Sequence, residues 1–118
     1  MAFHATHRFA RISARKVRRL ADLIRGQMAS DALDILRHQP QRGARLLEKV
    51  LQSAMGNAQD PDQSRGHTVR VSHLVVTDAR VDQGPTFKRI QPRARGMAFM
   101  ILRRMSHIHV TLQDMNEI

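Results

Sequence analysis

Pairs of histidines and aspartates are the residues of this sequence whose spacing could support metal or acid–base chemistry. His4 and His7 lie three residues apart, and His107 and His109 lie two apart on one face of a predicted strand, so each pair could meet a metal ion. Neither pair has a convincing third ligand, such as a nearby cysteine or paired carboxylate. The sequence therefore predicts no metal site and no cofactor. A metal-dependent hydrolase that uses these histidines is kept as an alternative, which metal analysis of the purified protein would test.

The carboxylates offer no better basis for catalysis. Asp31 and Asp34 fall early in a predicted helix, where negative charge suits the helix dipole, and Asp60 and Asp62 fall in a predicted turn. No glycine-rich phosphate loop and no serine, histidine and aspartate arrangement stands out. We expect no catalytic residues and a protein that is not an enzyme.

Positive charge dominates the composition. The 118 residues include 20 Lys+Arg and 10 Asp+Glu, which gives a formal net charge of +10. Most of the cations are arginines, which favour planar, bidentate contacts with phosphate. The charge predicts a nucleic acid as partner or, failing that, an anionic membrane, and it disfavours a soluble domain that is merely basic.

The cations are concentrated in two acid-free segments, residues 1–21 and 83–113. A surface that is only solvated usually mixes its charges, so this segregation indicates two anion-contacting surfaces. With no Trp or Tyr and only four Phe, contacts to phosphates and RNA shape are favoured over base stacking, although Phe87 and Phe99 could stack or pack. RNA is the expected partner. An architectural DNA-binding protein with a basic ribbon in a groove is the alternative.

Length and composition bound the architecture and the compartment. A chain of this length fits one domain, expected to span residues 1–118. The absence of cysteine permits a reducing compartment, and the sequence shows neither a transmembrane-length apolar run nor a signal-peptide core. The arginine-rich start could mimic a transit peptide, but its helical pattern indicates part of the fold. We expect a cytoplasmic protein.

Hydrophobic periodicity predicts a first helix over residues 14–25. Ser13 is suited to cap its start, and Gly26 can take the left-handed position after its end. The apolar residues recur on one side of this helix, and most of its arginines fall on the opposite side. One face is therefore expected to pack and the other to be positively charged.

Two further helices and a loop follow. A short helix is predicted from a cap at Ser30 to a stop at Pro40, and a third helix from about residue 41 to 58 carries a broad apolar stripe. Turn-forming residues predict a loop over residues 60–66.

After the loop the hydrophobic period changes from 3.6 to 2. Residues 69–81 alternate apolar and polar side chains, with Leu74 and Val76 as exceptions, and predict a long strand. Residues 107–113 alternate in the same way and predict a second strand.

The stretch between these strands predicts an extended hairpin arm. Pro85, Pro92 and Gly96 mark positions where a hairpin must bend or turn. We expect residues 82–104 to form the distal part of the arm, with the tip near residues 91–93. A two-stranded ribbon is barely stable alone in water, so a partner is expected to order it.

Four strings in this order resemble bacterial large-subunit ribosomal protein 22, of the universal large ribosomal subunit protein 22 family. They are SARKVRRLADLIRGQ at 13–27, DALDIL at 31–36, KRIQPRARG at 88–96 and RRMSHI at 103–108. The resemblance spans nearly the whole chain, and the spacing of the last two strings is quite specific. The start of the chain aligns with the start of the family, which argues against an added targeting segment.

The resemblance implies an α+β fold, with three helices packed on a small antiparallel sheet and a long extended β-hairpin arm. It implies a structural constituent of the large ribosomal subunit that binds large-subunit rRNA and bridges rRNA domains during assembly. The hairpin would line the peptide exit tunnel, with the globular part near the tunnel exit. The implied partners are rRNA, neighbouring large-subunit proteins and the nascent peptide, without a membrane or a homo-oligomer.

The resemblance and the charge pattern together give the expected site residues. The predicted rRNA-binding residues are Arg8, Arg11, Arg15, Lys16, Arg18, Arg19, Arg25, Lys88, Arg89, Arg93, Arg95, Arg103, Arg104 and His107. The predicted tunnel-lining tip consists of Lys88, Arg89, Ile90, Gln91, Pro92 and Arg93.

The sequence departs from the family pattern at three places. Met97 stands where the family usually has a polar or basic residue, Gln83 replaces a common acid, and the chain ends in the tail MNEI. The second departure makes the arm slightly more positive.

Overall fold

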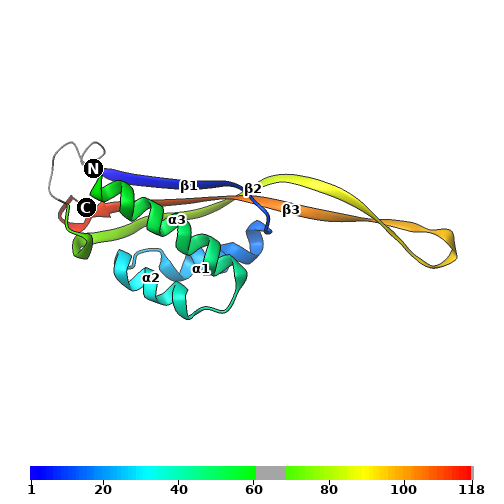
Figure 1. Ribbon diagram of the computed structural model, residues 1–118, viewed down its shortest axis with the longest axis horizontal. Helices are drawn as coiled ribbons and strands as arrows, with labels where there is room; N and C mark the ends of the chain where they lie inside the picture. The colour runs from blue at the N-terminus through cyan, green and yellow to red at the C-terminus, as the bar shows by residue number, and fades with distance from the viewer. Residues whose placement is uncertain (61–68, 118) are drawn as a thin grey trace.

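Three helices cover one face of a three-stranded antiparallel sheet, and two of the strands continue far beyond the helices as a hairpin (Figure 1). The computed structural model describes residues 1–60 and 69–117. Its helices and strands are β1 (Ala2–Ala10), α1 (Ala14–Ile24), α2 (Ala29–His38), α3 (Arg42–Gln59), β2 (Leu74–Pro92) and β3 (Ala98–Asp114). The strand order is β1-β3-β2, so β3 pairs with both of its neighbours. The α+β architecture expected from the sequence is confirmed.

The first helix follows the sequence prediction closely. Helix α1 buries the apolar stripe that includes Val17, Leu20 and Ile24, and Gly26 has a φ of 85° two residues after its end. The backbone N–H of Gly26 donates to the carbonyl of Val76 at 2.8 Å. The left-handed turn therefore joins the end of α1 directly to β2.

Gly26→Ala is expected to destabilise the protein by about 1–2 kcal/mol, because a Cβ is disfavoured in the left-handed region even where space is available. A Cβ at Gly26 would meet nothing within 4 Å, so the cost is conformational and not steric. Gly56→Ala is the matched control, since Gly56 lies inside α3 and a Cβ there also meets nothing within 4 Å. Alanine should stabilise that helix by about 0.5–1 kcal/mol. Urea unfolding should therefore shift the midpoint in opposite directions for the two variants, and equal shifts would contradict this account.

The other two helices differ slightly from the predictions at their ends. Helix α2 begins at Ala29 with Met28 as its N-cap residue, so the prediction that Ser30 caps this helix is wrong. Met28 takes the extended cap conformation because it forms an isolated β-bridge with Val75, which fixes the start of the helix from outside. Helix α3 spans Arg42–Gln59, within a residue of the predicted ends. The predicted loop at 60–66 falls almost entirely outside the described residues.

The core lies between the helices and the covered face of the sheet. Leu36, Leu47 and Leu51 from α2 and α3 are fully buried together with Ile108 and Leu112 from β3. Burying side chains of this size is the main source of stability in a fold of this size. No residue between Val81 and Met105 belongs to the buried apolar set, so the core ends where the arm begins.

Strand β2 begins later than the sequence predicted and contains a β-bulge. Residues Val71–His73 form a 3-10 turn, so the predicted strand over 69–81 is wrong in its first part. The register with β3 shifts between Val76 and Asp78, which places one extra residue on β2. Leu74 and Val76 are buried before the bulge and Ala79 and Val81 after it. The bulge inverts the alternation, which explains the two exceptions to it in the sequence.

Strands β2 and β3 continue as a two-stranded arm after β1 ends. The last pair of β1 with β3 is Ala10 with Ser106, whereas β2 and β3 remain paired from Thr86 and Arg104 as far as Pro92 and Ala98. The molecule measures 66 × 27 × 19 Å, and its radius of gyration is 17.5 Å. A compact chain of this length would have a radius of gyration of about 13.5 Å. The arm accounts for this elongation.

The tip of the arm lies a few residues after the predicted position. Pro92 still pairs with Ala98, and the turn runs from Arg93 to Met97, whose carbonyl accepts the N–H of Arg93 at 2.6 Å. Arg95 and Gly96 have φ values of 63° and 70° and reverse the chain. The prediction of a tip near residues 91–93 is wrong by a few residues, because Arg95 and Gly96, and not Pro92, take the left-handed conformation that the reversal needs.

Candidate nucleic-acid interface

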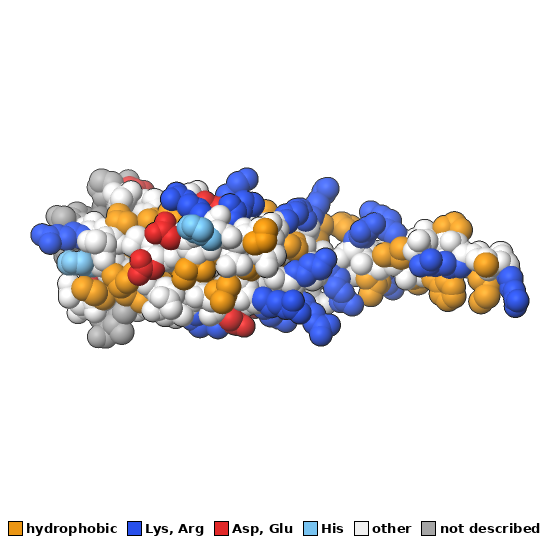
Figure 2. Space-filling model, turned by 90° about the horizontal axis from the view of Figure 1, so that it is seen from below, with side chains coloured by type: hydrophobic (Ala, Val, Ile, Leu, Met, Phe, Trp, Pro, Cys, Tyr) orange, Lys and Arg blue, Asp and Glu red, His pale blue; other side chains and the backbone are white. Residues whose placement is uncertain are grey.

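Beyond Asp82 the arm presents exposed cations along its length and has no acidic residue. Lys88, Arg89, Arg93 and Arg95 are all exposed, and the sequence from 83 to 113 contains no Asp or Glu. In Figure 2 the acidic side chains lie over the body, and the arm shows only basic, apolar and neutral side chains. Such a surface attracts an anion along its whole length.

Large apolar side chains are exposed between these cations. Ile90 pairs with Met100 across the ribbon, and the two side chains are 74% and 61% exposed. Phe87 and Phe99 are also about half exposed, and the guanidinium carbon of Arg89 lies 5.4 Å from the centre of the Phe87 ring. Solvent exposure of this much apolar surface is unfavourable for an isolated ribbon. The arm therefore has the composition of a surface that becomes covered.

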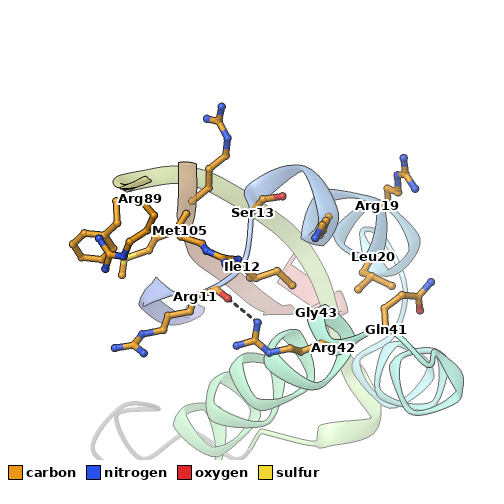
Figure 3. Close-up of a pocket in the computed structure, with 14 residues that line it drawn as sticks. Arg11, Ile12, Ser13, Arg19, Leu20, Gln41, Arg42, Gly43, Arg89 and Met105 are labelled. Atoms are coloured by element: carbon orange, nitrogen blue, oxygen red, sulfur yellow. Dashed lines mark hydrogen bonds between the residues drawn. The ribbon is translucent and has the colours of Figure 1, made fainter. Parts of the chain in front are cut away.

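A basic cavity of about 980 Å³, here called the root cavity, lies where the arm leaves the body. Three parts of the chain contribute to it, namely the β1–α1 connection with α1, the start of α3, and the base of the arm (Figure 3). Its lining residues are Arg11, Ile12, Ser13, Lys16, Arg19, Leu20, Gln41, Arg42, Gly43, Phe87, Arg89, Arg103, Arg104 and Met105. Seven of these are cations and none is an acid.

Local backbone features bring these parts together. A Cβ at Gly43 would lie only 3.2 Å from Leu20 Cδ1, so the glycine lets the start of α3 pack closely on α1. At the end of β1, Phe9 has a φ of 58° within a bulge, and its N–H donates to Nδ1 of His107 at 3.1 Å. This bulge turns the chain from the sheet into the connection that lines the cavity.

Among the residues that the structure describes, the cations of the root cavity form no ion pair with an acidic side chain. Ion pairs elsewhere on the body join Arg25 to Asp22, Arg37 and Arg45 to Glu48, and His109 to Asp82. In the part of the chain that the structure describes, none of the seven cavity cations takes part in these pairs. Like charges held close together raise the energy of the free protein, and a bound anion relieves this repulsion.

The first turn of α1 opens on the same cavity. Ser13 precedes this helix, makes no capping hydrogen bond with its side chain, and is followed by a first turn without an acidic residue. The unpaired N–H groups of a helix start favour negative charge and add to the field of the surrounding guanidinium groups.

The structure brings together six of the fourteen predicted rRNA-binding residues in the root cavity. These six are Arg11, Lys16, Arg19, Arg89, Arg103 and Arg104. Arg93 and Arg95 lie farther out on the arm, and Lys88 lies between Phe87 and Arg89 without lining the cavity. Arg8 and Arg15 are exposed elsewhere. The assignment of all fourteen to rRNA remains a prediction.

Three predicted residues also hold the fold together. Arg18 Nε donates to the carbonyl of Val81 at 3.0 Å, and Arg25 donates to the carbonyl of Ala79. Strand β2 is an edge strand, so these arginines satisfy carbonyls that no neighbouring strand reaches. The ring of His107 lies edge-on to Phe9, with centroids 5.0 Å apart, and so supports the β1 bulge.

Sequence reasoning missed Arg42 as a member of the basic surface. Arg42 lies outside both acid-free segments, and it donates to the carbonyl of Arg11 at 2.7 Å, as the dashed line in Figure 3 shows. One signal in the sequence could have identified it. Arg42 is the first residue of α3, where the helix dipole disfavours a positive charge, so a cation at this position indicates another role.

His4 and His109 take part in hydrogen bonds across the sheet. His109 lies between Thr6 Oγ1 and Asp82 Oδ2, each at 3.2 Å, and His4 Nδ1 lies 3.0 Å from Thr111 Oγ1. Within residues 1–60 and 69–117, no group of three or more His, Cys, Asp or Glu is arranged to hold a metal ion. These contacts join the three strands on the face that the helices leave uncovered.

The fold and the surface together define a class, a small basic α+β protein whose distinctive feature is a cationic arm and not a catalytic centre. Residues 5–113 match the family described as ribosomal protein L22p/L17e. The chain is also 64% identical over 116 residues to the large ribosomal subunit protein uL22 of Rhodopirellula baltica, and the alignment covers 98% of each chain. The chain belongs to the ribosomal protein L22p/L17e family.

Membership of this family confirms the resemblance found in the sequence. The chain is a structural component of the large ribosomal subunit, a ribonucleoprotein particle of the cytoplasm, and it is not an enzyme. Among the described residues, no helix is both long enough and apolar enough to span a bilayer.

Proposed function

We propose that the chain binds large-subunit rRNA through two connected surfaces, the exposed cations of the arm and the root cavity. The observation that carries this proposal is the separation of charge, with an acid-free arm on a body that holds the acidic residues. Arginine and lysine on the arm neutralise phosphates where RNA strands converge, and the release of counterions favours the complex. Covering the exposed apolar side chains adds to this stabilisation.

The arm is proposed to reach into the subunit and to line the peptide exit tunnel, while the globular part sits near the tunnel exit. Family membership and the extension of the arm well beyond the core support this arrangement. A single domain of residues 1–118, with 82–104 as the distal arm, would contact several rRNA domains at once and bridge them during assembly. Neighbouring ribosomal proteins and the nascent peptide are the further proposed partners, and the chain is proposed to act as one copy.

Competition between large-subunit rRNA and duplex DNA for the free protein tests the choice of nucleic acid. We expect rRNA to displace a labelled duplex DNA of equal length at a lower concentration, because RNA offers 2′-hydroxyl groups and irregular strand junctions in addition to phosphates. Filter binding at fixed salt measures both affinities. A preference for duplex DNA would favour the alternative, in which the basic ribbon enters a DNA groove.

A further inference from the structure

The root cavity is lined by both cations and apolar side chains, whereas a site for a phosphate alone would need only the cations. Its cations surround apolar side chains from two directions, with Ile12 from the β1–α1 connection and Phe87 and Met105 from the arm. Its volume of about 980 Å³ is that of a pocket for a whole small molecule. We propose that the root cavity binds one unstacked nucleotide of RNA, with its base against Phe87 and its phosphate among the guanidinium groups. This inference rests on the proposed function and names the RNA feature that the site recognises.

The cations that line the cavity come from both the body and the arm. Arg11, Lys16 and Arg19 approach from the β1–α1 connection and α1, whereas Arg89 and Arg103 approach from the arm. In Figure 3, Arg89 and Met105 lie on one side of Ile12 and Ser13, and Arg19 lies on the other. A phosphate between these groups would join the arm to the body, and planar guanidinium groups can bind it through two oxygens.

The aromatic ring provides the surface for the base. Phe87 is 47% exposed, and with the guanidinium group of Arg89 beside it the ring forms a stacking surface that is both apolar and cationic. A base inside an RNA duplex is already stacked and cannot reach this surface, whereas a base in a bulge or loop can. The cavity therefore selects an unstacked nucleotide over a regular helix.

A pair of short RNA duplexes that differ in one position tests this inference with the full-length protein. One duplex carries a fluorescent 2-aminopurine as a single-nucleotide bulge, and the other carries it in a base pair. We expect the bulged duplex to bind about 5- to 150-fold more tightly, which is the range for stacking one base on an aromatic side chain. The 2-aminopurine fluorescence of the bulged duplex should fall on binding, because the base stacks.

Two matched variants assign the effect to the cavity. Phe87→Ala should abolish the preference for the bulged duplex and leave the affinity for the paired duplex within about twofold. Phe99→Ala should retain the preference, since Phe99 is 53% exposed on the same arm but does not line the cavity. Neither ring belongs to the core, so thermal unfolding should show both variants folded.

The outcomes separate this inference from the proposed function. Equal binding of both duplexes, or a preference that survives Phe87→Ala, would overturn the nucleotide site and leave rRNA binding intact. Binding of neither duplex would overturn both.

Discussion

Replacing Lys88, Arg89, Arg93 and Arg95 together with glutamine is expected to lower the affinity for large-subunit rRNA by on the order of 100- to 1,000-fold at 0.1 M salt. The slope of log affinity against log salt is negative, and each phosphate contact that is lost makes it shallower by about 0.7–0.9. The loss of four contacts should therefore make it shallower by about 3. The four side chains are exposed and outside the core, so the fold should be unaffected. Filter binding over a salt series measures both quantities.

A variant with the same loss of charge outside the two acid-free segments is the control. Arg37, Lys49, Arg70 and Arg80 are also exposed and can be replaced by glutamine together. This variant loses the same net charge, but the charges that it loses lie outside the proposed rRNA-binding surfaces. It should therefore show only a small general loss of affinity and nearly the wild-type slope. If both variants weaken binding equally, net charge and not the arm would explain the affinity.

Removing the outer arm should separate folding from rRNA binding. Thr86 pairs with Arg104, so residues 87–103 can be replaced by Asn-Gly, a sequence suited to a tight two-residue hairpin turn. None of the removed residues belongs to the core, and we expect the free energy of unfolding to change by less than about 1 kcal/mol. The affinity for rRNA should fall further than in the four-residue variant, because the apolar contacts and part of the root cavity are lost as well.

Two measurements check the truncated protein. Urea unfolding reports stability, and co-sedimentation with large subunits after a high-salt wash reports assembly. A truncated protein that no longer folds would show that the arm contributes to the core. One that still co-sediments as the wild type does would contradict the role proposed for the arm.

The sequence predicted the helices well because their signals are local. Apolar residues at a spacing of three and four define the buried face of α1, and a glycine two residues after its end takes the left-handed conformation. The cap of α2 was less predictable, since Met28 is fixed by a bridge to Val75, a contact between residues far apart in the chain.

The strands were harder to predict because each bulge inverts the alternation of side chains. The extra residue after Val76 divides β2 into two parts of opposite parity, and a second register shift between Gln83 and Thr86 falls where the arm leaves the sheet. A register shift depends on pairing with β3, and the residues of β2 alone do not specify it. Pro85, which has no N–H to donate, was a local sign of the second shift.

The sequence predicted which residues give the candidate site its positive charge, but it did not predict the cavity that they form. The acid-free segments identified six of the seven cavity cations, but no pattern in the sequence showed that Arg19 and Arg103 line one cavity. That proximity results from the packing of α1 against the sheet, while the close approach at Gly43 adds the start of α3 to the cavity. Arg42 was missed for the same reason, because its place in the cavity is a property of the tertiary fold.

The central claim is that charge concentrated on the arm and at its root binds large-subunit rRNA. The most direct test is the slope of log affinity against log salt for the wild-type protein with large-subunit rRNA. We expect a steep negative slope that becomes shallower by about 3 when Lys88, Arg89, Arg93 and Arg95 are replaced together. An affinity that is insensitive to salt, or a slope that these four substitutions leave unchanged, would contradict it.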